Sequence, residues 1–144
     1  MSKQTFSFKD KYGSYTLSIE KRIICAHITG AIGLSLCNRY NRDFSLLVEQ
    51  IGTEPWGHYG DFRDCEALTT EAKQLSIAMH DEAVKKGCVV SAYQMSSALL
   101  VNQFNYIRQS NELAAPVNQR IFASKDECIG FIENYLQNVS PAKG

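Results

Sequence analysis

The stretch that decides the fold is Ile23-Ile24-Cys25-Ala26-His27-Ile28-Thr29-Gly30. It is almost continuously apolar, which predicts a β-strand covered on both faces near the centre of a sheet. From Ser35 to Ile51 the apolar residues instead recur with a helical period. Gly52 is a suitable residue to end that helix. A buried strand followed directly by an amphipathic helix indicates an α/β domain.

The segments on either side extend this alternation. The expected strands cover residues 5–8, 15–19, 56–62, 88–93 and 120–123, and the expected helices begin after Thr69 or Thr70, after Ser96 or Ser97, and after Ser124. The pattern predicts a mixed, mostly parallel sheet of five to six strands with four helices, because strand–helix–strand units pair their strands in parallel. We expect one domain over residues 1–137 and a flexible tail over residues 138–144.

The composition excludes several classes of protein. The chain has 144 residues, of which 44% are apolar and 21% charged, as in an ordinary globular domain. Fifteen Lys and Arg balance fifteen Asp and Glu, so no overall field attracts nucleic acid, and no nucleic-acid partner is expected. The longest apolar runs, such as 98–101, are far shorter than the roughly 20 residues of a membrane-spanning helix.

The cysteines and glycines predict a reduced, cytoplasmic protein without a cofactor. The five cysteines are an odd number spread along the chain, and no secretory segment follows Met1. No CxxC, CxxH or HExxH spacing is present, so we expect no metal site. The glycine spacing at residues 30–33 matches neither GxGxxG nor GxxxxGK[ST], so no nucleotide is expected.

Catalysis is not expected, although Cys65 or a group of acidic residues could make the chain a hydrolase or a transferase. Cys65 is a candidate nucleophile near a strand end, but its neighbours Asp64 and Glu66 would raise the pKa of its thiol. Asp61, Asp64 and Glu66 could together hold a divalent cation or act as a general base. Carboxylates in such places serve more often as helix caps.

A ligand site is predicted at the carboxyl ends of the strands, where ligands of open α/β sheets bind. Apolar and aromatic side chains gather there and could line a pocket or simply fill the core. The predicted ligand-binding residues are Ile32, Arg63, Tyr93, Met95 and Phe104. Arg63 is the expected polar anchor for an acidic head group.

The order of hairpin and alternating strands and helices resembles the STAS domain, the fold of bacterial anti-anti-sigma factors. Residues 15–32 with the following helix, residues 59–64 and residues 120–127 resemble the SpoIIAA-like group of uncharacterised bacterial proteins. The resemblance spans Phe6 to Leu136. It implies a small non-enzymatic α/β domain, similar also to the lipid-carrying CRAL-TRIO domains, for which binding of apolar ligands or of a membrane surface has been suggested.

Regulatory STAS members carry an Asp-Ser-Ser/Thr-Gly phosphorylation motif at a helix start. The matching stretch here is Leu68-Thr69-Thr70-Glu71, which keeps a hydroxyl at Thr70 and lacks the Asp and the Gly. Free N–H groups at a helix start favour a phosphate, whereas Glu66 and Glu71 oppose it. Helix capping is the alternative role for Thr69 or Thr70.

Two functions follow from these observations. The leading hypothesis is a cytoplasmic, non-catalytic domain that binds a small apolar or lipid-like ligand and associates transiently with membranes. The alternative is an anti-anti-sigma-like switch that binds a protein partner and is regulated at Thr70. The sequence leaves open whether the chain forms a homodimer.

Overall fold

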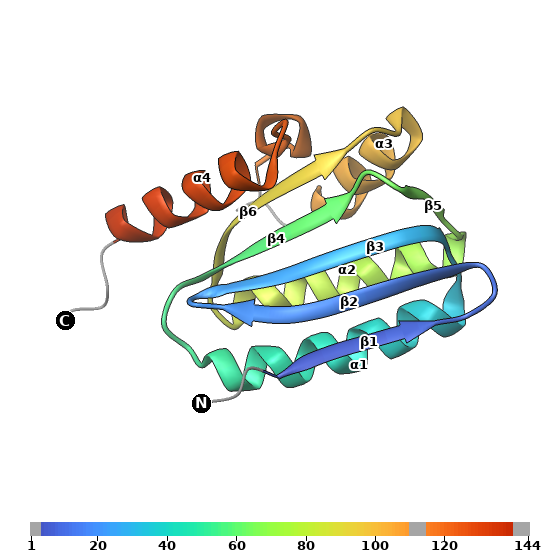
Figure 1. Ribbon diagram of the computed structural model, residues 1–144, viewed down its shortest axis with the longest axis horizontal. Coiled ribbons are helices and arrows are strands. Elements are labelled where there is room, and N and C mark those ends of the chain that lie inside the picture. Colours follow the sequence, from blue (N-terminus) through green and yellow to red (C-terminus); the bar gives the residue numbers. More distant parts are fainter. Residues whose placement is uncertain (1–3, 110–114, 140–144) are drawn as a thin grey trace.

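A computed structural model describes residues 4–109 and 115–139, and Figure 1 shows the arrangement of its elements. The strands are β1 (Thr5–Lys9), β2 (Gly13–Glu20), β3 (Ile23–Ile32), β4 (Trp56–Phe62), β5 (Cys65–Leu68) and β6 (Cys88–Met95). The helices are α1 (Leu34–Ile51), α2 (Thr70–Lys85), α3 (Ala98–Arg108) and α4 (Lys125–Asn138), with a 3₁₀ turn, η1, at Val117–Arg120.

The sheet is mixed, as the sequence predicts. Its order in the described residues is β1-β2-β3-β4-β6, and β5 pairs with the end of β3. β1, β2 and β3 run antiparallel to their neighbours in the N-terminal meander, whereas β4, β5 and β6 join the sheet in parallel. The parallel strands therefore end at one edge of the sheet, which we call the carboxyl edge.

The two faces of the sheet carry separate cores, because successive side chains of a strand point to opposite faces. Ile24, Ala26 and Ile28 of β3 belong to the larger core, which α1, α2 and α3 cover. Ile23 and Cys25 belong to a smaller core, in which Cys128 and Ile132 of α4 pack on β4 and β6. Ile23 to Ala26 of β3 are thus buried on both faces, which explains their unbroken apolar sequence, whereas His27 further along the strand is exposed.

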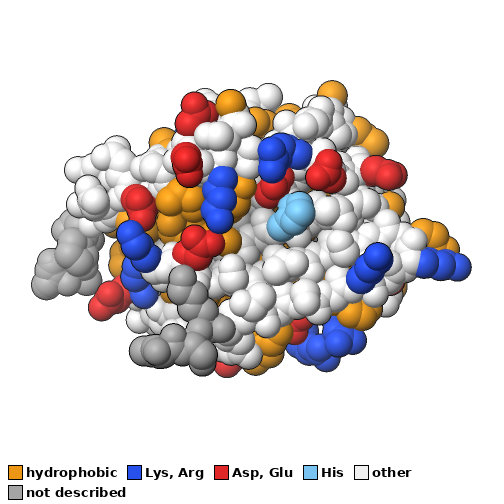
Figure 2. Space-filling model, in the orientation of Figure 1, with side chains coloured by type: hydrophobic (Ala, Val, Ile, Leu, Met, Phe, Trp, Pro, Cys, Tyr) orange, Lys and Arg blue, Asp and Glu red, His pale blue; other side chains and the backbone are white. Residues whose placement is uncertain are grey.

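α4 leaves part of its face of the sheet open. The helix lies along β4 and β6, away from β1 and β2 (Figure 1). The side chains of β2 that point away from the larger core are polar, among them Ser14, Thr16 and Ser18. Figure 2 looks onto this side and shows a largely uncharged surface over β2 and β3. The open face is solvated rather than covered.

Helix starts follow the predicted capping residues. Thr69 accepts a hydrogen bond from the backbone N–H of Ala72, and Ser97 caps α3 in the same way. Ser124 caps α4, while Glu127 accepts a hydrogen bond from the N–H of Ala123. These side chains satisfy N–H groups that a helix leaves unpaired at its first turn.

Two segments differ from the sequence-based expectation. Residues 65–68, which lie between an expected strand and an expected helix, form β5, which pairs with β3 beyond a shift of register at Gly30. The strand expected at 120–123 is reduced to one bridge between Ile121 and Tyr93, preceded by η1. The predicted tail begins at Asn138, which ends α4, and its residues 140–144 lie outside the described residues.

No helix in the described ranges is both long enough and apolar enough to cross a membrane.

Candidate functional site

The starts of three helices meet at the carboxyl edge. The N–H of Thr69 donates to the carbonyl of Ile32, which places the beginning of α2 beside the β3–α1 junction. The side chain of Gln103 on α3 bonds both backbone groups of Leu68, donating to its carbonyl at 2.8 Å and accepting from its N–H at 3.0 Å. The Ser97 hydroxyl donates to the carbonyl of Glu66. These bonds link the start of α2 to the end of β3 and link β5, which precedes α2, to α3.

Exposed apolar side chains lie on α1 and α3, the two helices that contact α2. Leu34 on α1, Leu99 on α3 and Tyr106 on α3 are 49%, 57% and 50% exposed. Lys73 of α2 lies 4.5 Å above the ring of Tyr106 and links α2 to α3 at the surface. We call Leu34, Glu66, Thr70, Leu99 and Tyr106 the switch surface. Exposed apolar groups gathered with a few polar ones are typical of protein-binding sites.

Thr70 is the exposed hydroxyl of the switch surface. It is the first residue of α2, and its side chain is free of the capping role, which Thr69 performs. Glu66 and Glu71 are exposed close to it in the sequence. The expectation that Thr69 or Thr70 caps the helix is thereby resolved in favour of Thr69, and the Thr70 hydroxyl stays accessible.

The predicted ligand residues divide between two faces of the sheet. Ile32, Tyr93 and Phe104 line a cavity of about 90 Å³ between the sheet and the three helices of the larger core. Met95 packs against the same core without lining the cavity in the described structure. Arg63, the residue after β4, lies on the other face, because it bonds Asp61, whose side chain points away from the core that its strand neighbour Phe62 fills.

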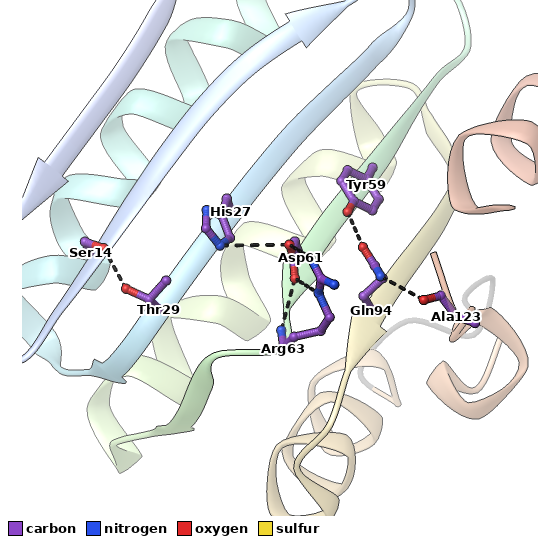
Figure 3. Close-up of polar contacts among 8 residues, drawn as sticks. All are labelled: Ser14, His27, Thr29, Tyr59, Asp61, Arg63, Gln94 and Ala123. Carbon is purple, nitrogen blue, oxygen red and sulfur yellow. Dashed lines mark hydrogen bonds and ion pairs between the residues drawn. The ribbon is translucent and has the colours of Figure 1, made fainter. Parts of the chain in front are cut away.

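Arg63 belongs to a polar cluster on the open face, which Figure 3 shows. Its Nε and Nη2 atoms donate to the two carboxylate oxygens of Asp61 at 3.0 and 2.8 Å. These hydrogen bonds hold the pKa of Asp61 below its ordinary value. His27 lies 3.9 Å from the same carboxylate. Arg63 is thus occupied by Asp61 and is not the anchor of a ligand in the cavity.

Two further sets of hydrogen bonds in Figure 3 stabilise the sheet. Ser14 and Thr29 share a hydrogen bond of 2.7 Å between neighbouring strands. The Tyr59 hydroxyl donates to the side chain of Gln94, whose amide donates to the carbonyl of Ala123 before α4. The second chain of bonds ties α4 to β4 and β6.

Two of the candidate catalytic groups are buried or paired with another side chain. Cys65 is buried, and burial, with a smaller effect of Glu66, raises the pKa of its thiol to about 12. A thiol with that pKa is protonated at neutral pH and a poor nucleophile. Asp61 is engaged by Arg63. Within the described residues, no group of three His, Cys, Asp or Glu side chains could hold a metal ion.

The sequence reasoning did not identify the apolar part of the switch surface. A signal for it exists on α3, where the buried stripe is Leu100, Phe104 and Ile107. Leu99 and Tyr106 fall off that stripe by helical spacing, so they had to face solvent or a partner.

The antiparallel meander, the parallel strands and the helices on both faces have the arrangement of a STAS-type fold. The chain is similar to the solved structure of the anti-sigma factor antagonist SpoIIAA in its unphosphorylated form, with a TM-score of 0.63 and 10% identity over 83% of this chain and 96% of that one. An anti-sigma factor antagonist from Mycobacterium paratuberculosis gives a TM-score of 0.57 and 8% identity over 90% and 95% of the two chains. The phosphorylated form of Bacillus SpoIIAA gives 0.55 and 13% over 82% and 98%.

These likenesses confirm the predicted SpoIIAA-like fold. No protein-family model and no curated protein matches the chain. The similarity to known proteins therefore lies in the three-dimensional structure, at identities of 8–13% in the structures compared.

The leading hypothesis, binding of a small apolar or lipid-like ligand or of a membrane, is wrong. Three solved structures that share this fold over most of both chains are of SpoIIAA or of an anti-sigma factor antagonist, which favours the alternative. The cavity agrees with that correction, because its volume of about 90 Å³ is well below the roughly 300–1,000 Å³ of ligand pockets. Ile32, Tyr93 and Phe104 are core residues around a small void.

Proposed function

We propose that this chain is a non-catalytic protein-interaction switch of the anti-sigma-factor-antagonist kind. A protein partner binds the switch surface, and phosphorylation of Thr70 weakens that complex. The fold is shared with an antagonist solved in both unphosphorylated and phosphorylated forms. The observation that carries the proposal is the exposed Thr70 at the start of α2, a helix that contacts α1 and α3, both of which carry exposed apolar side chains.

The surface suits a protein better than a small molecule. Its apolar residues, Leu34, Leu99 and Tyr106, come from two helices and are each about half exposed. Such side chains gain more by burial against a second apolar surface than by contact with a small polar ligand. The hydrogen bonds of Gln103 and Ser97 keep the elements in place, so little order has to be gained on binding.

A phosphate on Thr70 would change the surface in two opposing ways. The positive end of α2 favours the phosphate locally. The modification also adds about 1.5 to 2 negative charges, close in sequence to the exposed carboxylates of Glu66 and Glu71. The centre of an apolar interface then becomes strongly acidic and hydrated, and burying it against a partner becomes costly.

The Thr70→Glu substitution tests this switch. Immobilised protein is used to isolate the partner from cell extract, and the affinity of the purified partner is measured by biolayer interferometry. We expect Thr70→Glu to raise the dissociation constant about tenfold or more, equivalent to about 1.4 kcal/mol, and Thr70→Ala to change it little. The matched control is Thr53→Glu, which places the same charge on an exposed threonine of the α1–β4 loop.

The apolar part of the surface provides a second readout in the same assay. Leu99→Ser should weaken the complex, whereas Leu46→Ser, at a leucine of α1 that is 42% exposed, should not. Equal affinities for the wild-type chain, Thr70→Glu and Leu99→Ser would show that the partner binds elsewhere and that Thr70 is not the switch.

A further inference from the structure

A hollow of about 340 Å³ lies at the other end of α2, far along the helix from Thr70. Its described lining comes from the last part of α2, from β6, from the end of α3, from η1 and from α4. Arg108 and Arg120 both line it, together with His80, Ser91 and Tyr135. We call these five residues the arginine hollow.

Arg108 is held in place inside the protein. The residue is only 5% exposed, and its Nε atom donates to the carbonyl of Ala115 at 2.6 Å. Its Nη1 atom donates to the hydroxyls of Ser91 at 2.7 Å and Tyr93 at 3.4 Å. These acceptors, the ones among the described residues, are neutral, so they orient the guanidinium and do not balance its charge. A buried cation is costly unless an anion compensates it.

Arg120 brings a second positive charge to the same hollow. Its guanidinium carbon lies 5.0 Å from the ring centre of Phe131, which fixes the side chain against α4. Burial, and then the repulsion from Arg108, lowers the pKa of Arg120. None of the described residues that line the hollow is Asp or Glu. Two cations therefore face one cavity whose described walls hold no carboxylate.

Neutral polar groups complete the lining. His80 is uncharged at pH 7, because burial and then Arg108 lower its pKa to about 4. Its buried Nδ1 atom has no hydrogen-bond partner in the described structure. Ser91 and Tyr135 add hydroxyl groups, which can donate to an anion as well as accept.

We propose that the arginine hollow binds a small phosphate dianion, either inorganic phosphate or the phosphate of a small monoester. Guanidinium groups match the geometry of phosphate oxygens and bind them through paired N–H donors. A dianion balances the two arginines, whereas a monoanion balances one. The volume is that of a small-molecule site. This site is separate from the switch surface, so its test is independent of the role of Thr70.

Nuclear magnetic resonance of the full ¹⁵N-labelled chain tests the site. Sodium phosphate, methyl phosphate, and sodium acetate are titrated separately at about pH 7.5, with sodium chloride keeping the ionic strength constant. We expect phosphate or methyl phosphate to give saturable shifts of the backbone signals of Ser91 and Arg120. Acetate should bind more weakly than either. Binding of methyl phosphate but not of phosphate assigns the site to monoesters, and the reverse assigns it to inorganic phosphate.

The variant Arg120→Gln should raise the dissociation constant about tenfold or more, because it removes a charged donor of hydrogen bonds. Arg42→Gln, which removes an exposed arginine from α1, is the matched control and should bind as the wild type does. Arg108→Lys keeps the positive charge but loses the planar guanidinium with its paired N–H donors, so it should also weaken binding. Equal binding by Arg120→Gln, equal binding of acetate, or shifts spread over the surface without saturation would each overturn the proposal.

Discussion

Lowering the pH from 7 to 4 should reduce the free energy of unfolding by roughly 3–6 kcal/mol, because two histidines are buried without charge. Burial is the main cause for both, and it lowers the pKa of His58 to about 3 and that of His80 to about 4, from an ordinary value of 6.5. His58 and His80 also repel each other when charged, and Arg108 repels both. The interior therefore excludes the protonated forms.

The sign of this pH dependence follows from the pH range in which the unfolded chain and the native chain each bind protons. Below pH 6.5 the unfolded chain takes up a proton at each histidine, while the native chain does so only near pH 3–4. The stability is thus complete above pH 6.5 and declines as the pH falls, by up to about 1.4 kcal/mol per pH unit for each histidine. The lowered pKa of Asp61 acts in a more acidic range, below the ordinary value of 3.8.

Urea unfolding at several pH values measures this decline. The single tryptophan, Trp56, is fully buried and reports unfolding by fluorescence. His58→Phe should reduce the pH dependence by about half, since one of two titrating groups is removed. The rings of Phe44 and Tyr93 meet His58 edge-on at 5.3 and 5.7 Å, so another aromatic ring is a suitable replacement. An unchanged pH dependence in that variant would contradict the assignment to His58.

Most of the fold could be predicted from local patterns. The apolar stretch at 23–30 and the helical spacing at 35–51 coincide with β3 and α1 because burial requires those periods. The helix starts at Thr69, Ser97 and Ser124 were predictable because a hydroxyl caps free N–H groups three residues on. Each of these signals lies within a short segment of sequence.

β5 and the region of Ile121 could not be predicted because their structure depends on distant partners. β5 is four residues long and pairs with β3 only after the register shifts at Gly30. That shift needs a residue with positive φ, which is +81° here, and with no side chain against the Tyr12 carbonyl. Ile121 pairs with Tyr93 across one bridge, too little to extend a strand.

In the candidate site, too, some features follow from local sequence patterns and others depend on residues far apart in the sequence. Ile32, Tyr93 and Phe104 come together because they lie near the carboxyl edge on one side of the sheet. Arg63, the residue after β4, does not join them, because it bonds Asp61, and adjacent strand positions such as Asp61 and core residue Phe62 face opposite ways. Strict use of that alternation would have removed Arg63 from the ligand site. The burial of Arg108 depends on Ser91 and Tyr93 of another element, which no local pattern identifies.

Gly57→Ala should destabilise the protein by about 2–3 kcal/mol, because the added methyl group overfills the smaller core. Gly57 lies on β4 directly under α4, and a Cβ atom there would collide with Cγ2 of Ile132 and approach Cγ1 of Val90 at 3.1 Å. Ile132 is fully buried, so its own truncation, Ile132→Ala, should cost about 2–5 kcal/mol. Urea unfolding of the single and double variants measures both effects.

The double variant Gly57→Ala/Ile132→Ala should be more stable than the sum of the two losses predicts, by about 1 kcal/mol or more, because the new methyl group fills part of the space that Ile132 vacates. Gly130→Ala is the matched control on α4: nothing lies within 4 Å of its added Cβ, so it should stabilise the helix by about 0.5–1 kcal/mol. Additive losses at positions 57 and 132 would mean that α4 does not press on β4 at this point. Coupled losses would show that close packing of Gly57 against Ile132 holds α4 on β4 and β6. This packing would then keep α4 away from β2 and leave the face of the sheet there open to solvent.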